Sequence, residues 1–337
     1  MKLSVVIPCR NEKNHIAECI HSIFSSDLTE NIEMTVIVVD GMSSDGTREI
    51  VSDLKTKYSN LVLVDNIDQL TPFAFNIGIN YSIFDYLQIV GARHIISKKY
   101  IIISINILIS KTEIWCVGGK LINAYTNYES EIISKAMNSS FGMGLGNFRL
   151  LLKSGFTDTV TSPMYPKFVF DKIGFFDEKL ARNQDDDFNF RIKKSKGKIW
   201  IENSISLKYY VRSSYLGLFK QFFQYGYWKV FVNKKHAVIT TLRQLAPPLF
   251  VVYLIVVPLL FLKLKGSFLL TLLPFFVYLL IAFYLSVKNS ICIKEFFGIF
   301  KTYLILHISY GLGYLYGISH FYILRKKPSQ KQKNLSR

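Results

Sequence analysis

The side chains best suited to chemistry are carboxylates that directly follow apolar runs or gather in short acidic stretches. Asp40 follows the apolar run 36–39, and a carboxylate at a strand end can accept hydrogen bonds from a uracil-like base or a ribose. The alternative is an Asx turn or a helix N-cap, a role that suits Ser44 or Asp45 better than Asp40. No Gly-x-Gly-x-x-Gly or Walker pattern follows this run, so we expect neither a dinucleotide cofactor nor a P-loop.

A second acidic stretch, Asp185-Asp186-Asp187, follows Asn183 and Gln184. One positioned carboxylate can take a proton from an attacking hydroxyl group. Mutual repulsion among the three carboxylates favours a raised pKa in at least one of them. The alternative is a solvated acidic turn that begins a helix, which is the commoner meaning of such a run.

The chain around these carboxylates alternates apolar runs with helical patterns, which predicts an α/β domain. The predicted strands cover 3–7, 34–39, 61–64 and 86–90, and the predicted helices cover 14–24 and 44–58. Right-handed crossovers then give a parallel sheet, whose ligands bind at the carboxyl ends of the strands. Those ends are the polar segments 8–12 and 40–47.

Two of these segments resemble a known family. Ser4–Glu12 and Val38–Thr47 look like the two opening motifs of inverting family 2 glycosyltransferases, which have the GT-A fold. The likeness continues at 72–78, 117–119, 141–144, 158–160 and 174–178. The sub-group most similar to this chain is the succinoglycan-type, membrane-attached enzymes of exopolysaccharide synthesis, which also end in several hydrophobic segments.

The resemblance implies transfer of a sugar, with inversion, from a nucleotide-diphosphate donor, a UDP-sugar being favoured, to a lipid-linked or growing polysaccharide acceptor. Asn183–Arg191 matches the acidic-loop motif of the family and assigns the catalytic base to Asp185, although Gln184 stands where Glu is usual. The residues assigned to the donor are Pro8, Arg10, Glu12, Asp40, Asn76 and Arg93. The residues assigned to the acceptor or the diphosphate are Asp186, Arg212, Gln221 and Trp228.

The metal position departs from the family pattern. Members usually carry Asp-x-Asp or Asp-x-His after the fourth strand, where the last ligand coordinates a divalent ion, Mg²⁺ or Mn²⁺, that bridges the diphosphate. Here Gly91 and Arg93 occupy those positions. His94 is a candidate ligand after a one-residue shift, but a lone surface histidine is the favoured interpretation. Arg93 can neutralise phosphate directly, so we expect it to replace the ion.

Two further segments have both a functional and an ordinary interpretation. Residues 141–149 supply a glycine-rich loop through which backbone could approach a sugar or pyrophosphate, although spaced glycines also make ordinary turns. Residues 210–229 resemble a membrane-proximal segment related to the Gln-x-x-Arg-Trp element of processive polysaccharide synthases. The alternative for the second is an amphipathic interfacial helix over 215–232. That role is favoured for Phe222, Phe223 and Tyr225, and the two are evenly balanced for Gln221 and Trp228.

Composition separates the two ends of the chain. Of 337 residues 50% are hydrophobic, and the formal charge is +17. Residues 211–337 hold 17 Lys and Arg against one acidic residue, and they are also the most apolar third. This combination indicates a membrane anchor with positive flanks and argues against nucleic-acid binding. The four cysteines have no paired spacing, so we expect buried thiols, with neither disulfides nor zinc.

We therefore divide the chain into a GT-A domain at 1–210, an interfacial segment at 211–243, a transmembrane region at 244–324 and a basic tail at 325–337. Three uncharged segments could cross a bilayer, at 244–262, 266–287 and 302–324. No cleavable targeting signal is expected before the first strand, because 3–7 is too short for a signal core. The expected location is the cytoplasmic (inner) membrane, multi-pass, with the catalytic domain facing the cytoplasm.

Three crossings would place the basic tail outside, against the positive-inside tendency. One segment is then re-entrant or interfacial, or the tail breaks the rule, and we favour a cytoplasmic tail. A rival hypothesis is a catalytically weak or inactive relative that binds other glycan synthases in the membrane, motivated by the missing metal motif. A nucleotide-binding transporter component is disfavoured, because phosphate-loop motifs are missing and the spans are too few.

Overall fold

The computed structural model describes residues 1–144, 153–261 and 268–328. It divides into two compact units, Met1–Asn123 with Leu151–Tyr210 and Ala124–Leu150 with Val211–Arg337. The sequence placed 124–150 in the first domain, whereas the described residues 124–144 belong to the second unit. The predicted 141–149 loop lies outside the described residues from 145 onward, as does the predicted tail from 329.

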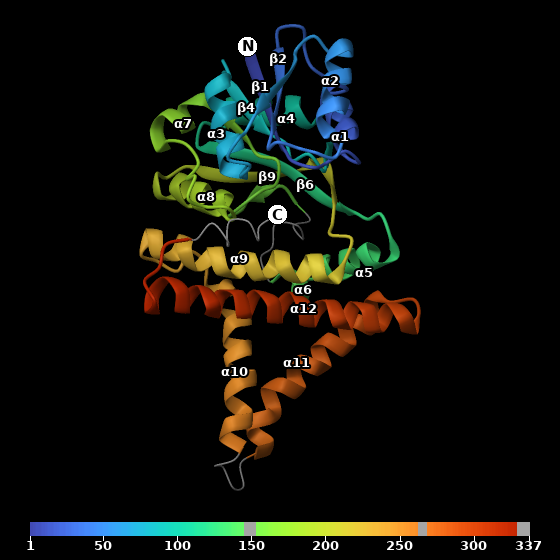
Figure 1. Cartoon of the computed structure of the whole chain (residues 1–337), viewed down its shortest axis with the longest axis vertical. Helices are drawn as coiled ribbons and strands as arrows, with labels where there is room; N and C mark the ends of the chain where they lie inside the picture. Colours follow the sequence, from blue (N-terminus) through green and yellow to red (C-terminus); the bar gives the residue numbers. More distant parts are fainter. Residues whose placement is uncertain (145–152, 262–267, 329–337) are drawn as a thin grey trace. The chain divides into compact units, whose positions relative to one another are not determined.

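The first unit is a single mixed sheet flanked by helices (Figure 1). Its strands are β1 (Lys2–Cys9), β2 (Glu33–Asp40), β3 (Leu61–Asp65), β4 (Tyr86–Ile89), β5 (His94–Ile96), β6 (Ile114–Ala124), β7 (Gly155–Phe156), β8 (Met164–Pro166) and β9 (Lys198–Tyr210). Its helices are α1 (Ile16–Phe24), α2 (Thr47–Lys57), α3 (Thr71–Tyr81), α4 (Tyr100–Ser110), α7 (Lys167–Ile173) and α8 (Gln184–Lys194). The strand order is β3-β2-β1-β4-β8-β6-β9-β5, with β7 beside β9.

The half of the sheet that carries the first motifs is parallel, as predicted. β1 lies between β2 and β4, and β2 also pairs with β3. All five residues of 36–40 on β2 are buried, as expected for a strand covered by helices on both faces. The sheet turns antiparallel from β8 onward, a change that the sequence did not indicate.

Helix boundaries differ from the expected ones by two or three residues. α2 begins at Thr47 instead of 44, because Gly46 adopts a left-handed conformation with φ of 99° just before it, which glycine does readily. Neither Ser44 nor Asp45 is the N-cap. Three cysteines are buried as predicted, but Cys292 is exposed, so the expectation of a buried thiol is wrong there.

The second unit is helical. Its helices are α5 (Tyr128–Met137), α6 (Ser140–Met143), α9 (Tyr215–His236), α10 (Ala246–Phe261), α11 (Phe268–Asn289) and α12 (Ile293–Ile318), with a 3₁₀ turn at Leu242–Leu245 and a π-turn at Ser319–Ile323. α9 and α12 lie side by side (Figure 1). Glycines bring the two backbones together: a Cβ at Gly313 would collide with the Phe223 carbonyl, and one at Gly226 with the Tyr310 carbonyl.

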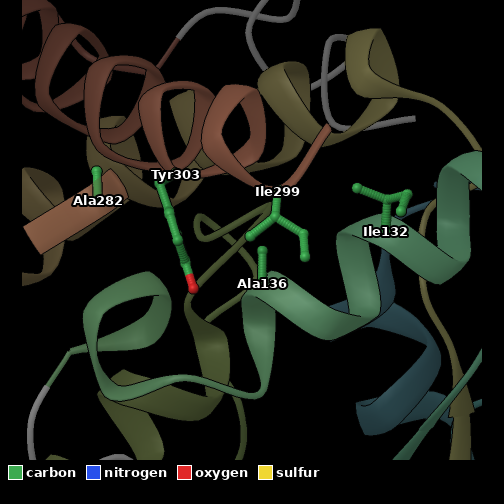
Figure 2. Close-up of a cluster of buried hydrophobic side chains, with 5 residues drawn as sticks. All are labelled: Ile132, Ala136, Ala282, Ile299 and Tyr303. Atoms are coloured by element: carbon green, nitrogen blue, oxygen red, sulfur yellow. The ribbon is translucent and has the colours of Figure 1, made fainter. Parts of the chain in front are cut away.

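A small apolar cluster joins α5, α11 and α12 within this unit. Ile132 and Ala136 of α5 face Ile299 and Tyr303 of α12, and Ala282 of α11 completes the cluster (Figure 2). Beside it, Lys135 of α5 lies 2.7 Å from the buried carboxylate of Glu295, the one acidic residue after 210. The sequence did not predict that residues near 130 would join the C-terminal helices.

Among the described residues, one helix is long and apolar enough to cross a membrane, over Thr271–Asn289 in α11. α10 is apolar but has 16 residues. The third segment predicted at 302–324 falls largely in α12, which packs along α9 and buries Thr302, Leu306 and Gly313. Three full crossings are therefore not supported, because the sequence cannot tell burial against protein from burial in lipid.

Candidate functional site

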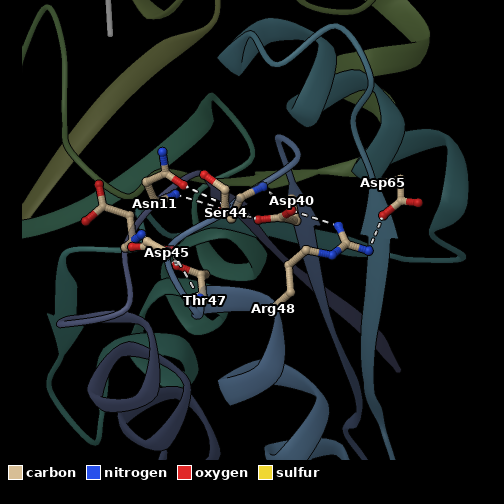
Figure 3. Close-up of polar contacts among 9 residues, drawn as sticks. Asn11, Asp40, Ser44, Asp45, Thr47, Arg48 and Asp65 are labelled. Carbon is tan, nitrogen blue, oxygen red and sulfur yellow. Dashed lines mark hydrogen bonds and ion pairs between the residues drawn. The ribbon is translucent and has the colours of Figure 1, made fainter.

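The loops that follow β1 and β2 are bonded to each other (Figure 3). The backbone N–H of Glu12 donates to Thr47 Oγ1 at 2.9 Å, and that of Lys13 donates to Asp45 Oδ2 at 3.2 Å. In the reverse direction, the N–H of Ser44 donates to Asn11 Oδ1 at 3.0 Å. The two predicted motif segments therefore form one polar edge at the carboxyl ends of neighbouring parallel strands, where ligands of α/β sheets bind.

Asp40 lies at the base of this edge and is completely buried. Its carboxylate accepts hydrogen bonds from the Ser43 N–H at 2.9 Å and from the Ser43 hydroxyl. Arg48 Nη1 of α2 donates to it at 2.8 Å, while Arg48 Nη2 lies 2.8 Å from Asp65 at the end of β3. The base or ribose contact of Asp40 stays a prediction, because its present partners are protein groups.

Arg48 and Asp65 were missed by the sequence analysis. The hydrogen bonds from Arg48 to Asp40 and to Asp65 raise the pKa of the guanidinium, so the Arg48 side chain stays positively charged. The register that places Asp40 beside Asp65 is seen only in the structure, and no sequence motif pointed to Arg48 between them.

Two predicted donor residues, Glu12 and Arg93, form an ion pair. Arg93 Nε lies 2.8 Å from Glu12 Oε1 and 2.7 Å from Oε2, and both side chains are partly buried. Arg10, the third charged residue of this group, has buried Nε and Nη1 atoms without a hydrogen-bond partner among the described residues. Pro8 is half-buried beside them on β1, in register with Val39.

The position of the family's metal motif is built differently here. His94 Nδ1 accepts the Gly91 N–H at 3.2 Å and lies 2.7 Å from Ser162 Oγ. A Cβ at Gly91 would lie 2.9 Å from His94 Cε1, so the imidazole occupies the space that a ligand side chain at 91 would need. Within residues 1–144, 153–261 and 268–328, no three His, Cys, Asp or Glu side chains come together as metal ligands would. The metal role of His94 stays a prediction.

Asn76 connects two motif segments that are 100 residues apart. Its amide Nδ2 donates to the Phe176 carbonyl and to Glu178 Oε1, both at 2.9 Å, and its Oδ1 accepts the Phe176 N–H at 3.0 Å. The side chain is almost completely buried. In this structure Asn76 positions the segment before α8, and its predicted contact with the donor is untested.

The three predicted carboxylates of α8 have different environments. Asp187 is completely buried, and Arg191 Nε donates to it at 3.0 Å. Asp186 accepts a hydrogen bond from Asn183 Nδ2 at 2.8 Å. Asp185 is the exposed member, in the first turn of the helix. The structure thus separates one surface carboxylate from two that organise the helix start.

The guanidinium of Arg191 fixes where α8 begins. Besides Asp187, it donates to the carbonyls of Ile173 at 2.6 Å and Phe175 at 2.7 Å. Asn76 bonds the same segment at Phe176. The segment before the acidic turn is therefore held by hydrogen bonds from Arg191 and from Asn76, and it is not a loosely solvated loop.

The predicted residues of the second unit lie on α9 or just before it. Gln221 Nε2 donates to Tyr225 Oη at 2.8 Å. Trp228 is completely buried, with its ring against Tyr227 and Phe231, and its Nε1 has no hydrogen-bond partner among the described residues. Arg212 is half-buried. Phe222 is buried, so the headgroup position favoured for it is wrong.

Residues 4–102, which include the joined loops, match the model of glycosyl transferase family 2. The chain carries a family 2 glycosyltransferase domain. Over 240 residues this glycosyltransferase is 29% identical to a dolichyl N-acetyl-alpha-D-glucosaminyl phosphate 3-beta-D-2,3-diacetamido-2,3-dideoxy-beta-D-glucuronosyltransferase of Methanococcus voltae, covering 69% of this chain and 74% of the relative. It is 27% identical to the succinoglycan biosynthesis protein ExoA of Rhizobium meliloti over 245 residues, covering 72% and 73%.

The glycosyltransferase also resembles a solved structure. The mannosyltransferase PcManGT from Pyrobaculum calidifontis, in complex with GDP-Man and Mn²⁺, matches with a TM-score of 0.63 at 12% identity, over 94% of this chain and 86% of that one. At that identity the likeness shows the fold alone. The predicted GT-A type of α/β fold followed by a helical region is confirmed.

Proposed function

We propose that this glycosyltransferase moves a sugar, with inversion, from a nucleotide-diphosphate donor to a lipid-linked or growing polysaccharide acceptor at the cytoplasmic face of a membrane. The observation that carries the proposal is the polar edge made by the bonded loops after β1 and β2, together with the separately fixed start of α8. Two relatives, one named for a dolichyl-linked sugar phosphate and one for succinoglycan biosynthesis, support this acceptor class.

In this proposal Asp185 is the general base. Asp187 is buried against Arg191 and Asp186 is half-buried, whereas Asp185 is exposed, so Asp185 is the carboxylate best placed to meet an acceptor. It takes the proton of the acceptor hydroxyl, whose oxygen bonds the anomeric carbon as the bond from that carbon to the donor phosphate breaks. The nucleoside diphosphate leaves with the electron pair of that bond, and one displacement inverts the anomeric centre.

The second unit is proposed to attach the enzyme by a helical hairpin. α10 and α11 extend away from the α9–α12 pair within this unit (Figure 1), and large apolar side chains such as Leu249, Ile255, Leu280 and Tyr284 are exposed on them. α10 spans about 24 Å at 1.5 Å per residue, less than the roughly 30 Å of a bilayer core. A hairpin that enters and returns leaves α12 and the basic tail on the cytoplasmic side.

This arrangement resolves the charge conflict of three crossings, because the Lys and Arg of the tail then obey the positive-inside tendency. It also suits a lipid-linked acceptor, which is confined to the bilayer surface. An anchored active site meets such a substrate at a high effective concentration.

The test is sugar transfer by the full chain in anionic vesicles, using UDP-sugars and GDP-sugars with polyprenyl-phosphate-linked sugars as acceptors. Asp185→Asn should lower kcat about 10²- to 10⁴-fold, the usual contribution of a positioned base, without changing the melting temperature. Asp171→Asn, an exposed carboxylate on α7, is the matched control and should retain full activity. Asp185→Asn activity within about tenfold of wild type would refute the base assignment.

The altered metal position also supports a second candidate function. In that function the protein is a catalytically inactive partner of other glycan synthases. Folded protein that binds neither UDP nor GDP, in EDTA or with Mg²⁺ or Mn²⁺, would favour that role.

A further inference from the structure

The residues at the metal position of this chain do not fit a divalent cation. Gly91 has no ligand side chain, and the ring of His94 blocks the space beside it. His94 Nδ1 is already engaged by the Gly91 N–H and by Ser162. Between them stand Ala92, which has no ligand atom in its side chain, and Arg93, a cation without an acceptor atom. Whatever neutralises the diphosphate at this edge must come from another source.

Arg10 offers a positive charge that no carboxylate of the described residues pairs with. A guanidinium stays protonated in proteins, and its Nε and Nη1 are buried without a hydrogen-bond partner in the part of the chain that the structure describes. Arg10 as a whole is half-buried, but N–H groups of a cation that are buried without an acceptor cost free energy, which an anion that pairs with them would recover. The side chain lies against Gly41, where a Cβ would be 3.3 Å from its Cβ and Cδ, so the loop after β2 holds it in place.

Arg93 presents the other half of such a site. Glu12 engages its Nε alone, and its Nη1 and Nη2 atoms have no partner among the described residues. Those two nitrogens form the edge of the guanidinium that grips phosphate oxygens in pairs. β1 and β4 are adjacent and parallel, so Arg10 and Arg93 follow the same end of neighbouring strands.

We propose that Arg10 and Arg93 together bind the diphosphate of the donor in place of a divalent cation, with Glu12 as the positioning residue for Arg93. The ligand chemistry is a pair of phosphate oxyanions, which planar guanidinium groups match in geometry and charge. This inference rests on the proposed function, because it names how that same site holds the nucleotide. It makes sugar transfer independent of added metal.

The experiment measures the affinity of the detergent-solubilised full chain for UDP, GDP, uridine and guanosine in EDTA, and again with Mg²⁺ or Mn²⁺. We expect the better diphosphate to bind in EDTA, at least tenfold more tightly than its nucleoside, with less than a twofold change on adding metal. Arg10→Met and Arg93→Gln should each weaken diphosphate binding at least tenfold and leave nucleoside binding unchanged. Lys55→Gln, which removes an exposed charge on α2, is the control and should bind as wild type.

The role of Glu12 is tested by a double-mutant cycle. Glu12→Gln should weaken diphosphate binding in the wild-type background and have no further effect in Arg93→Gln. An equal loss in both backgrounds would overturn its positioning role. Arg10→Lys keeps the positive charge and serves as the conservative control for Arg10→Met. Melting temperatures identify any variant that does not fold.

The outcomes separate this inference from the proposed function. Sugar transfer that requires Mn²⁺ and is insensitive to both arginine substitutions would overturn the two-arginine site and leave the proposed function intact. Metal-independent, arginine-dependent nucleotide binding without transfer to any lipid acceptor would support the site and refute the proposed acceptor. No nucleotide binding by folded protein under any condition would refute both.

Discussion

At the ends of β2 and β3, the guanidinium of Arg48 lies between the carboxylates of Asp40 and Asp65, 2.8 Å from each. The same edge contains Glu12 paired with Arg93 and Asp45 bonded to the opposite loop. Each of these charged groups thus has a partner on another element, whereas the Nε and Nη1 atoms of Arg10 have none within the described residues. At the scale of single residues, the site is a set of contacts between strands and loops in which the Arg10 guanidinium is left for an added anion to pair with.

The charge of Asp45 is expected to hold the two loops together in a pH-dependent way. Desolvation raises the pKa of Asp45, but hydrogen bonds from the Thr47 hydroxyl and from the N–H groups of Lys13 and Thr47 outweigh it and leave the pKa below its usual value. A carboxyl with a lowered folded pKa stabilises the fold above its unfolded pKa of about 3.9, and this stability is lost as pH falls through the folded pKa.

Asp45→Asn should therefore lower the free energy of unfolding at pH 6 by about 1 kcal/mol or less, the size of a contact at a helix start. The difference from wild type should shrink as the pH is lowered toward 3. Thermal unfolding at several pH values measures it, with Asp53→Asn on the exposed face of α2 as the control. A difference that stays constant with pH would contradict the charge-based explanation.

At the scale of elements, the most informative contact is that of α9 with α12. The helices touch along glycines, with Gly226 against the Tyr310 carbonyl, Gly313 against the Phe223 carbonyl and Gly317 against the Tyr227 carbonyl. Small residues at such positions let backbones approach closely. α12 therefore packs closely against α9. This packing supports placing α12 beside α9 instead of alone in a bilayer.

Gly313→Ala should force these helices apart, because a Cβ there has no room beside the Phe223 carbonyl. Overpacking of this kind costs typically about 1–3 kcal/mol, so we expect a lower melting temperature of the full chain in detergent. Gly155→Ala has no atom within 4 Å of its new Cβ and should leave the melting temperature unchanged. Equal melting temperatures for Gly313→Ala and wild type would show that the two helices are not tightly packed.

At the scale of the whole molecule, the excess of basic residues and the most apolar segments both lie in the C-terminal third of the chain. The +17 net charge comes almost entirely from residues 211–337, whereas the polar edge proposed to bind the donor belongs to the first unit, where Asp40, Asp65 and Glu12 face Arg48 and Arg93. A basic, apolar unit is attracted to an anionic lipid surface. In the proposed arrangement, the hairpin of α10 and α11 determines on which side of the membrane the later residues lie.

Cys292 provides a natural probe of that topology, because it is exposed between α11 and α12 while the other three cysteines are buried. If the hairpin returns, a membrane-impermeant maleimide should label Cys292 in inside-out vesicles and not in right-side-out cells. Lys327→Cys in a Cys292→Ser background should give the same pattern for the tail. Labelling of either position from the outside would instead indicate an odd number of crossings.

The sequence was sufficient for the parts of the fold that depend on local pattern. Apolar runs located β1, β2 and β3, and the motifs located the loops that the structure bonds together. The sequence could not predict contacts between distant residues of no motif, such as the Arg48 bridge or the tie from Asn76 to Phe176. It also counted 302–324 among three segments that could cross a bilayer, because an apolar segment looks the same whether glycines pack it on a neighbouring helix or lipid surrounds it.

The pairing of β5 with β9 has a consequence for synthesis of the chain. β5 ends at Ile96, and β9, the strand it pairs with, begins about a hundred residues later. At about 5–20 residues per second, the ribosome needs about 5–20 s to make the chain between them. Arg93 and His94 immediately precede or begin β5, so their positions are completed only when β9 emerges. The residues that emerge next are those of α9 and the proposed hairpin, so the part of the fold around Arg93 is completed shortly before the proposed membrane segments leave the ribosome.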